Sequence, residues 1–518
     1  MMSLLYTSSK LTESRVLTMN NRPINQDGDF ILYWMTSCRR FSFNASLQHA
    51  VTLSNQLKKP ILVVEAVSIT HKFANDRILS FMVQGIMDNI NEFNENLVSY
   101  IPWVEIKQRA GAKMLASLSE RSVCVVIDDY PTYTPSKIRD AAARNLQVRV
   151  DAVDSNGIFP MNWAEKEFTT AYSFRKYVQK NLLDAFQTIP EKNSVQHRDK
   201  DIRISKEIIN DLKKDLGFES TPLEWLWRVS EGGEIGNQAM KEFPIDHTVP
   251  AVLTSKGGVN EARIRLQKFL NYRLNKYSTD RNNPDKPAVS GLSPWLHFGH
   301  ISSYEIIQNV LTKENWGPNS LNHEDTGKGT RSGWWGVSES SSSFLDQIIT
   351  WRELGFNFAH NREDHATVET IPNWAKLSMK EHINDDRTIY SLEELERAET
   401  HDEIWNAAQR ELLRTGQMHN YMRMLWGKKI LEWSPSPEIA AENMIYINDK
   451  WALDGRDPNS YTGIFWVLGR HDRAWGPERP IFGKVRYMSS ESAYRKLKLK
   501  NYLQKYAKEE NVTLAKFG

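Results

Sequence analysis

Between residues 28 and 160, short apolar runs alternate with amphipathic stretches. Strands are expected at Asp29–Trp34, Pro60–Val67, Val104–Lys107, Ser122–Ile127 and Val148–Val153. Helices are expected between them at Asn44–Leu57, Arg77–Phe93, Ala112–Ser119 and Ser136–Arg144. Strands that alternate with helices indicate an α/β domain with a parallel, Rossmann-like sheet. No glycine-rich phosphate loop follows the first strand, so the usual dinucleotide fingerprint is absent.

The pattern changes along the rest of the chain. Residues 1–27 form an N-terminal extension, and residues 161–220 are a charged, irregular connector with helical stretches. Strand signals fade over 221–510, which predicts an all-α C-terminal domain. A polar stretch rich in Gly, Ser and Asn at 313–343 predicts a long surface loop that carries Trp334 and Trp335. Helices are expected at 259–276, 301–311, 344–360, 391–398, 402–415, 418–432 and 490–506.

Composition places the chain among ordinary globular proteins, since 40% of its 518 residues are hydrophobic and 25% are charged. No apolar run is long enough for a membrane span or a signal peptide. The Ser/Thr-rich start leaves an organellar targeting segment open as an alternative. Cys38 and Cys124 exclude a disulfide framework or zinc cluster, and Cys124 lies in an apolar run that predicts a buried thiol. We expect a metal-free protein of the cytoplasm, or of the nucleus or an organelle in a eukaryote.

The net charge of the whole chain is only +2, but positive and negative residues are unevenly distributed along it. From Arg473 to Lys500 there are eight Lys or Arg residues against Glu478 and Glu491. Such a stretch can neutralise DNA phosphates, and it can equally be a solvated basic helix face.

Tryptophan is concentrated after residue 225, and three indoles there have a suggestive spacing. Asp402 is expected to cap a helix that carries Trp405 and ends at Thr415-Gly416. Trp426 and Trp433 follow on the next helix, seven residues apart, so their rings share a face about 10.5 Å apart along the axis. Trp405 is expected to lie between them. Close indoles can relay an electron, although spacing alone favours core packing.

Two further motifs have both a functional and a structural interpretation. Asp454–Tyr461 is a turn rich in acids, and Arg423 is placed to pair with one of them. Such acids can accept hydrogen bonds from a flavin ring, or they can belong to a solvated turn. Ser290 and Ser293 flank Gly291-Leu292 at a predicted helix start, where they can hold a phosphate or simply cap the helix.

The order of four motifs is more specific than any one of them. SGLSPWLHFG, RTGQMHNYMRMLWGKKILEW, INDKWALDGRDPNSY and FGKVRYM closely resemble class II cyclobutane pyrimidine dimer DNA photolyases, within the photolyase/cryptochrome family. The resemblance extends over 260–310 and 344–500, and over 15–90 at the N-terminus. It implies an α/β antenna domain over 28–160 and a helical FAD-binding domain over 221–510.

The resemblance also implies roles for single residues. Asn448 matches the asparagine that faces flavin N5, and Arg423 with Asp454 matches an ion pair beside the flavin. Asp472 matches an acid behind Asn448, with a one-residue shift nearby. Tyr277, Ser290, Gly291, Leu292 and Ser293 match positions that hold the FAD diphosphate and adjoining groups, and Trp426, Trp405 and Trp433 match a relay, in order from flavin to surface.

A pocket for a flipped-out dimer is similar to that of the family and has the chemistry that such a substrate needs: aromatic or apolar walls, polar groups for base edges, and cations for phosphates. The loop Pro480–Arg486 is expected to lie against DNA. The matching residues are Arg281, Asn282, Trp351, Tyr421, Met424, Trp466 and Arg486.

Gln347 departs from the family, which has a glutamate four residues before the position of Trp351. In the family this carboxyl group hydrogen-bonds the dimer and stabilises charge during repair. Glutamine keeps the hydrogen bonds but cannot ionise, unless Asp346 or an ordered water takes over the role.

Three functions are therefore weighed: light-driven repair of pyrimidine dimers in double-stranded DNA, a cryptochrome-like blue-light sensor favoured by Gln347, and a light-independent nucleic-acid-binding module. The intact pocket favours repair over the sensor, and the relay together with the Asn448 match argues against the light-independent module. A deazaflavin rather than a folate is the implied antenna chromophore, and we expect the protein to act as a monomer.

Overall fold

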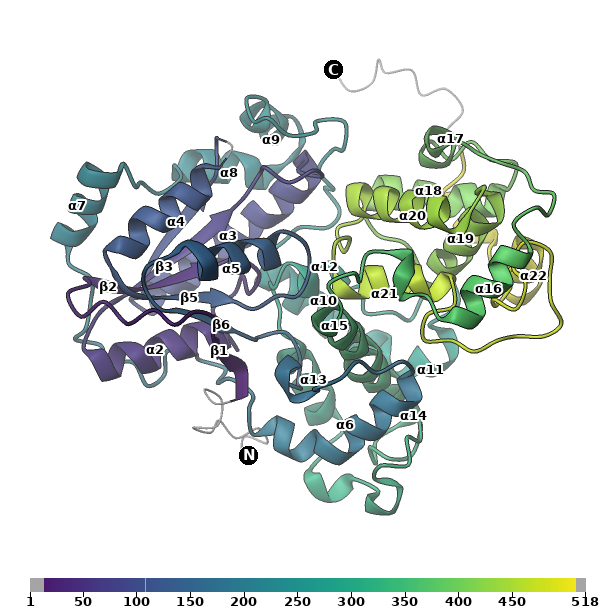
Figure 1. The fold of residues 1–518 in the computed structure, drawn as a ribbon, viewed down its shortest axis with the longest axis horizontal. Helices are drawn as coiled ribbons and strands as arrows, with labels where there is room; N and C mark the ends of the chain where they lie inside the picture. Colours follow the sequence, from purple (N-terminus) through teal and green to yellow (C-terminus); the bar gives the residue numbers. More distant parts are fainter. Residues whose placement is uncertain (1–13, 108, 509–518) are drawn as a thin grey trace. The chain divides into compact units, whose positions relative to one another are not determined.

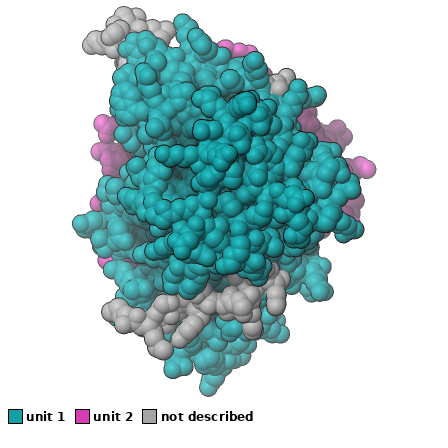
Figure 2. All heavy atoms as spheres, turned by 90° about the vertical axis from the view of Figure 1, so that its left-hand side faces the viewer, with its two compact units in different colours: residues 1–272, 290–362 teal, residues 273–289, 363–518 magenta. Residues whose placement is uncertain are grey.

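The computed structural model describes residues 14–107 and 109–508. Contacts divide the chain into two compact units, which Figure 2 shows in teal and magenta. Unit 1 comprises residues 1–272 and 290–362, and unit 2 comprises 273–289 and 363–518. The targeting interpretation concerns residues 1–13 above all, and these lie outside the described residues.

Unit 1 is built on a six-stranded sheet in the order β1-β6-β5-β2-β3-β4 (Figure 1). All neighbours are parallel except β1, which is antiparallel to β6 and pairs Val16 with Val153. The parallel sheet is thus confirmed, while the extension 1–27 contributes an unpredicted strand. The strands are β1 Val16–Thr18, β2 Phe30–Met35, β3 Ile61–Val67, β4 Ser99–Val104, β5 Ser122–Asp128 and β6 Val150–Val153.

Strand β4 begins five residues before the predicted start at Val104 and ends there. Pro102 inside this segment argues against a strand, because proline cannot donate to the ladder. The strand forms because β4 lies at the edge of the sheet and pairs only with β3.

Both faces of the sheet are covered. On β2, Ile31, Tyr33 and Met35 pack on one face with residues of α2, whereas Phe30, Leu32 and Trp34 pack on the other with residues of α4, α5 and α7. Burial on both sides explains why the strands read as continuous apolar runs. The helices that cover the two faces are α2 Ala45–Leu57, α3 Asp76–Glu95, α4 Ala110–Glu120, α5 Tyr133–Asn145 and α7 Lys206–Leu216.

The remaining helices of unit 1 extend this core. Helix α8 packs against α3, so helices beyond residue 220 join the α/β layer. This division of contacts differs from the predicted boundary near residue 220. These helices are α6 Ala171–Phe186, α8 Leu223–Glu231, α9 Gly233–Met240, α10 Val259–Tyr272, α12 Ser293–His297, α13 Ser303–Lys313, α14 Glu339–Leu345 and α15 Arg352–Asn361.

The segment 313–343 is not simply a surface loop. Trp334 and Trp335 are buried, and the Trp316 indole Nε1–H donates to the Trp335 carbonyl at 2.7 Å. The polar composition of the segment did not predict these buried tryptophans, because a few large rings can bury a large surface area.

Unit 2 is helical, with α19 packed against α18, α20 and α21. Gly427 lets α19 approach α21, since a Cβ there would lie 2.6 Å from Val467 Cγ2. Helix α20 was not predicted, although Ser436-Pro437 at its start is a helix-initiating signal. The helices are α11 Tyr277–Asp280, α16 Asn373–Glu381, α17 Leu392–Glu396, α18 Glu403–Thr415, α19 Asn420–Trp433, α20 Pro437–Trp451, α21 Pro458–Val467, α22 Ser490–Lys496 and α23 Lys500–Lys505.

Both cysteine thiols are buried in the described part of the chain. Cys124 is buried as predicted, and burial raises the pKa of both its thiol and that of Cys38 to about 12. Within the described ranges, no helix is both long enough and apolar enough to cross a bilayer.

Candidate functional site

Three tryptophans form a contiguous group in the core of unit 2. The rings of Trp405 and Trp433 meet edge to face with centroids 5.4 Å apart. The Trp405 indole Nε1–H donates to the Trp426 carbonyl at 3.0 Å. Trp405 therefore contacts both tryptophans of α19, as the sequence predicted.

Local signals explain how this group is positioned. Asp402 caps α18 and accepts from the backbone N–H of Trp405 at 3.1 Å, and Gly416 ends the helix with a φ of 67°. The Trp426 indole Nε1–H donates to the Gln409 side chain at 2.8 Å, and Trp433 also meets the ring of exposed His401 at 5.4 Å. The three indoles belong to the core, and their closeness is also what a relay needs; the relay itself stays a prediction.

The acidic turn after α20 brings two predicted cofactor residues together. Arg423 donates to Asp454 at 2.9 Å, so the expected ion pair forms. The turn is shorter than predicted, because Asp457 caps α21 and Pro458 is already its first residue. A place for this pair beside a flavin stays a prediction.

Asn448 lies near the end of α20 and is buried. Its amide donates to Asp449 Oδ1 at 3.5 Å, a long hydrogen bond. Asp449 in turn accepts from the Arg456 N–H at 2.8 Å and from the Tyr461 hydroxyl at 3.2 Å, while burial raises the pKa of its carboxyl group. The acid in hydrogen-bond contact with Asn448 is therefore Asp449, while Asp472, which was expected behind Asn448, accepts hydrogen bonds from Arg486.

A cavity of about 410 Å³ opens within unit 2. Four predicted dimer-pocket residues line it, namely Tyr421, Met424, Trp466 and Arg486. Arg281 and Asn282, which follow α11, are outside its lining. The other lining residues are Trp475, Gly476, Pro477, Arg479, Val485, Tyr487, Met488 and Lys496.

Trp475 is a wall of this cavity that the sequence analysis missed. The Arg486 guanidinium lies 4.0 Å from the centre of the Trp475 ring and 5.5 Å from that of Trp466. The available signal was position alone, because Trp475 falls within the basic stretch expected to face DNA. A second indole gives the cavity two aromatic walls.

Gln347 and Trp351 belong to unit 1, on the π-helix Asp346–Trp351 that interrupts the predicted helix 344–360. Such π-turns often occur at functional sites. Arg175 donates to both carboxylate oxygens of Asp346, at 2.7 and 3.0 Å. With both oxygens so engaged, Asp346 is poorly placed to replace the family's glutamate.

Ser290 to Ser293 also belong to unit 1 and lead into α12, which begins at Ser293. Leu292 occupies the N-cap position and has no side-chain acceptor, so the serines do not provide an ordinary N-cap. Gly291 has a φ of 66°, and a Cβ there would meet no atom within 4 Å. Open space beside this turn suits a bound phosphate group.

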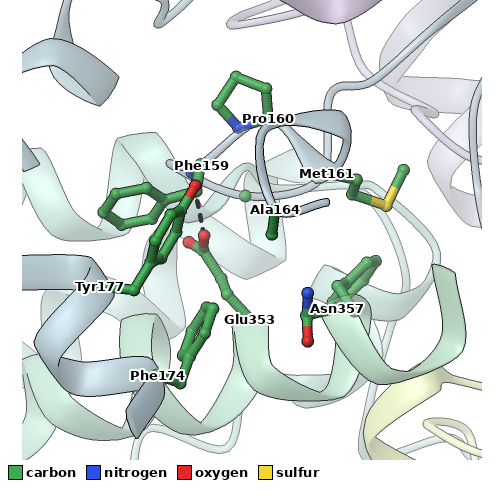
Figure 3. A pocket seen from close by; sticks show the side chains of 10 residues that line it. Phe159, Pro160, Met161, Ala164, Phe174, Tyr177, Glu353 and Asn357 are labelled. Atoms are coloured by element: carbon green, nitrogen blue, oxygen red, sulfur yellow. Dashed lines mark hydrogen bonds between the residues drawn. The ribbon is translucent and has the colours of Figure 1, made fainter. Parts of the chain in front are cut away.

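Unit 1 also holds a small cavity of about 20 Å³ that no sequence signal indicated (Figure 3). Glu353 points into it between Phe174 and Tyr177, and accepts from the backbone N–H groups of Ile158 and Phe159 at 2.7 and 3.0 Å. Burial raises the pKa of Glu353 to about 7 although these hydrogen bonds lower it. The cavity, at about 20 Å³, is too small to hold a cofactor.

Comparison with known proteins gives a full-length match. The chain is 31% identical to a deoxyribodipyrimidine photo-lyase of Methanothermobacter thermautotrophicus over 95% of its own length and 97% of that protein. The chain belongs to the deoxyribodipyrimidine photo-lyase family. Photo-lyases of Arabidopsis thaliana and Potorous tridactylus are each 30% identical, over 93% and 97% of the chain and 90% and 87% of the relatives. No protein-family profile matches the chain.

Solved structures agree on the photolyase fold. A class III photolyase from Agrobacterium tumefaciens has a TM-score of 0.63 at 14% identity, covering 92% of the chain and 86% of that protein. A cryptochrome from Synechocystis has a TM-score of 0.61 at 16% identity, covering 92% and 88%. Family membership makes this photolyase an enzyme of DNA repair and confirms the predicted fold class.

Proposed function

We propose that this photolyase repairs cyclobutane pyrimidine dimers in double-stranded DNA, using blue or near-UV light and a noncovalently bound FAD. The observation that carries the proposal is the unit 2 cavity, in which two indoles and two methionines offer apolar walls, and two arginines and a lysine offer cations. An unstacked pyrimidine pair needs such walls, and the phosphates beside it need the cations.

The donor groups suit FAD. Asn448 offers a buried amide to the flavin edge, and the Arg423–Asp454 pair offers both a donor and an acceptor. The serine hydroxyls and the open turn at Gly291 suit the diphosphate. When bound, reduced FAD supplies the electron that opens the dimer and receives it back, so the reaction has no net redox change. A deazaflavin antenna belongs to this proposal.

The chain's own residues hold the lesion and exclude water. Trp466 and Tyr421 give the lesion aromatic surface, and Met424 fills irregular space. Gln347 keeps a hydrogen-bonding amide for the base edges, as the family's glutamate does, without its charge. We expect the loss of charge to affect the reaction more than binding.

The test uses purified protein after chemical reduction of its flavin. Denaturation should release about one FAD per chain, and illumination should restore a dimer-containing duplex to intact pyrimidines. A dark sample and a dimer-free duplex are the controls. A protein that contains no flavin after reconstitution, or that leaves dimers intact in the light, would contradict the proposal.

A second function is favoured by Gln347 together with the engagement of Asp346 by Arg175. No carboxylate on that turn then serves the dimer, which suits a blue-light sensor that binds FAD without repair. Flavin photoreduction in a protein that binds dimers but does not repair them would support this alternative.

A further inference from the structure

Positive groups and indoles alternate around Arg486, which lines the unit 2 cavity together with Trp466 and Trp475. The Arg486 guanidinium lies over both Trp475 and Trp466, at 4.0 and 5.5 Å. Lys428 Nζ lies 5.2 Å from the Trp466 ring centre, and the Arg473 guanidinium lies 4.9 Å from that of Trp475. We call these five side chains the cation–indole stack. Cation–π contacts favour this alternation, but the guanidinium groups of Arg473 and Arg486 repel each other, and Lys428 adds to the repulsion when it is protonated.

One carboxylate is bound to the middle of the stack. Asp472 accepts from Arg486 Nε at 2.8 Å and from Nη2 at 3.1 Å, a bidentate pair. It also accepts from the Trp475 indole Nε1–H at 3.2 Å and from the Arg473 backbone N–H at 2.9 Å. The Asp472 side chain is 8% exposed and that of Arg486 is 36% exposed, so solvent and ligands reach the arginine first.

These contacts give Asp472 two effects on the cavity. Its geometry fixes the Arg486 fork and the Trp475 ring in one arrangement, because both bond to the same carboxylate. Its charge offsets that of Arg486, so the cation between the two indoles attracts a phosphate less than a free arginine would.

We propose that Asp472 is a positioning residue for DNA: it holds Arg486 against Trp475 and releases the guanidinium only to the backbone phosphate of a duplex whose damaged bases have entered the cavity. This inference rests on the proposed function. Undamaged duplex meets an arginine already paired with Asp472, whereas the distorted backbone at a dimer brings a phosphate close enough to compete. Asp472 thereby increases selectivity for damage at the expense of general affinity.

Asp472→Asn tests this inference. The amide keeps the size but no longer offsets the arginine, so affinity for undamaged duplex at low salt should rise about five- to tenfold. The salt dependence should steepen by about 0.9 in the log–log slope, the effect of one more phosphate contact. Affinity for dimer-containing duplex should change less than about twofold, so the ratio of the two affinities should fall.

Glu478→Gln is the matched control. Glu478 lies nearby along the same segment, pairs with Lys484 at 3.1 Å, and its removal changes the net charge by the same amount. Affinity for both duplexes should rise together, with their ratio unchanged. A fall in the ratio as large as that of Asp472→Asn would show that charge alone is responsible and would overturn the inference.

Two variants of Arg486 show whether the effect of Asp472→Asn comes from the lost pairing or from misfolding. Arg486→Lys keeps the charge but loses the bidentate geometry, and should lower the ratio without a change at Asp472. In an Arg486→Ala background, Asp472→Asn should raise affinity for both duplexes no more than Glu478→Gln does and should leave their ratio unchanged. An additive effect would contradict the pairing.

Failure of this inference and failure of the proposed function give different results. Loss of FAD in Asp472→Asn with unchanged DNA binding would return this acid to the predicted cofactor role and overturn the inference. If the natural protein shows no preference for dimer-containing duplex, the proposed function fails. The Asp472–Arg486 pairing is then decided by affinity for undamaged duplex, which Asp472→Asn should still raise more than Glu478→Gln does, but not in the Arg486→Ala background.

Discussion

Replacing Lys428 tests how strongly a buried charge lowers the stability of unit 2. This lysine of α19 is completely buried, and its ammonium donates to the Val467 carbonyl at 2.6 Å. Burial lowers its pKa from 10.5 to about 7; the charge of Asp472 opposes this shift and that of Arg486 adds to it. The charged form is thus poorly tolerated in the folded state, and Lys428→Met removes it with little change in shape.

The magnitude follows from the shift. A displacement of about 3.5 pKa units corresponds to about 5 kcal/mol of unfavourable free energy below pH 7. The variant loses the hydrogen bond to Val467, and the unpaired carbonyl costs about 1–3 kcal/mol. We therefore expect Lys428→Met to be more stable than the natural protein by about 2–4 kcal/mol near pH 7.

The pH dependence has a definite sign. Between pH 7 and 10.5 the unfolded chain binds more protons at this lysine than the folded one, so the stability of the natural protein rises with pH. The advantage of the variant should therefore shrink by about 2–3 kcal/mol between pH 7 and 9.

Urea unfolding followed by tryptophan fluorescence at both pH values measures this difference. Lys429→Met is the control on the same helix, because Lys429 pairs with Glu432 at 2.7 Å and its removal should give no gain. A Lys428→Met variant that is less stable at pH 7, or that differs from the natural protein equally at pH 7 and 9, would refute the reasoning.

Three further predictions concern other residues. Because burial raises the pKa of Glu353 from 4.5 to about 7, the folded state retains a proton that the unfolded state loses, and stability should fall by up to about 3 kcal/mol as pH rises from 4.5 to 7; Glu353→Gln should flatten this decline in thermal unfolding. Trp426→Phe should abolish photoreduction of oxidised FAD without releasing it, and Trp405→Phe should slow it; unchanged photoreduction, followed by absorbance, would leave these rings as core residues only. Gln347→Glu should raise repair per absorbed photon while dimer affinity changes less than about twofold, and equal efficiency in both forms would show that the carboxyl group is dispensable.

Local signals in the sequence determined strands β2, β3 and β5 of unit 1 and the ends of helix α18, which carries Trp405. The apolar runs of β2, β3 and β5 exist because a sheet covered on both faces needs them, so they can be recognised without the structure. Asp402 and Gly416 set the ends of α18 by local chemistry, which placed Trp405 correctly against α19. Helix α20 also has a local start signal at Ser436-Pro437, although the predicted helices did not include it.

Other features depended on contacts between residues far apart in the chain. Strand β1 exists because it pairs with β6, more than 130 residues later. The tryptophans of 313–343 are buried by packing that its polar composition does not show.

The partners of Asp472 were decided in the same way. Family position assigned this acid to Asn448, but the fold gives Asn448 its sequence neighbour Asp449 and gives Asp472 the guanidinium of Arg486. Periodicity and capping depend on neighbours within one or two turns, so the sequence alone determines them. Partner choice for a buried charge depends on which groups the completed fold brings within hydrogen-bonding distance, and only the tertiary structure decides that.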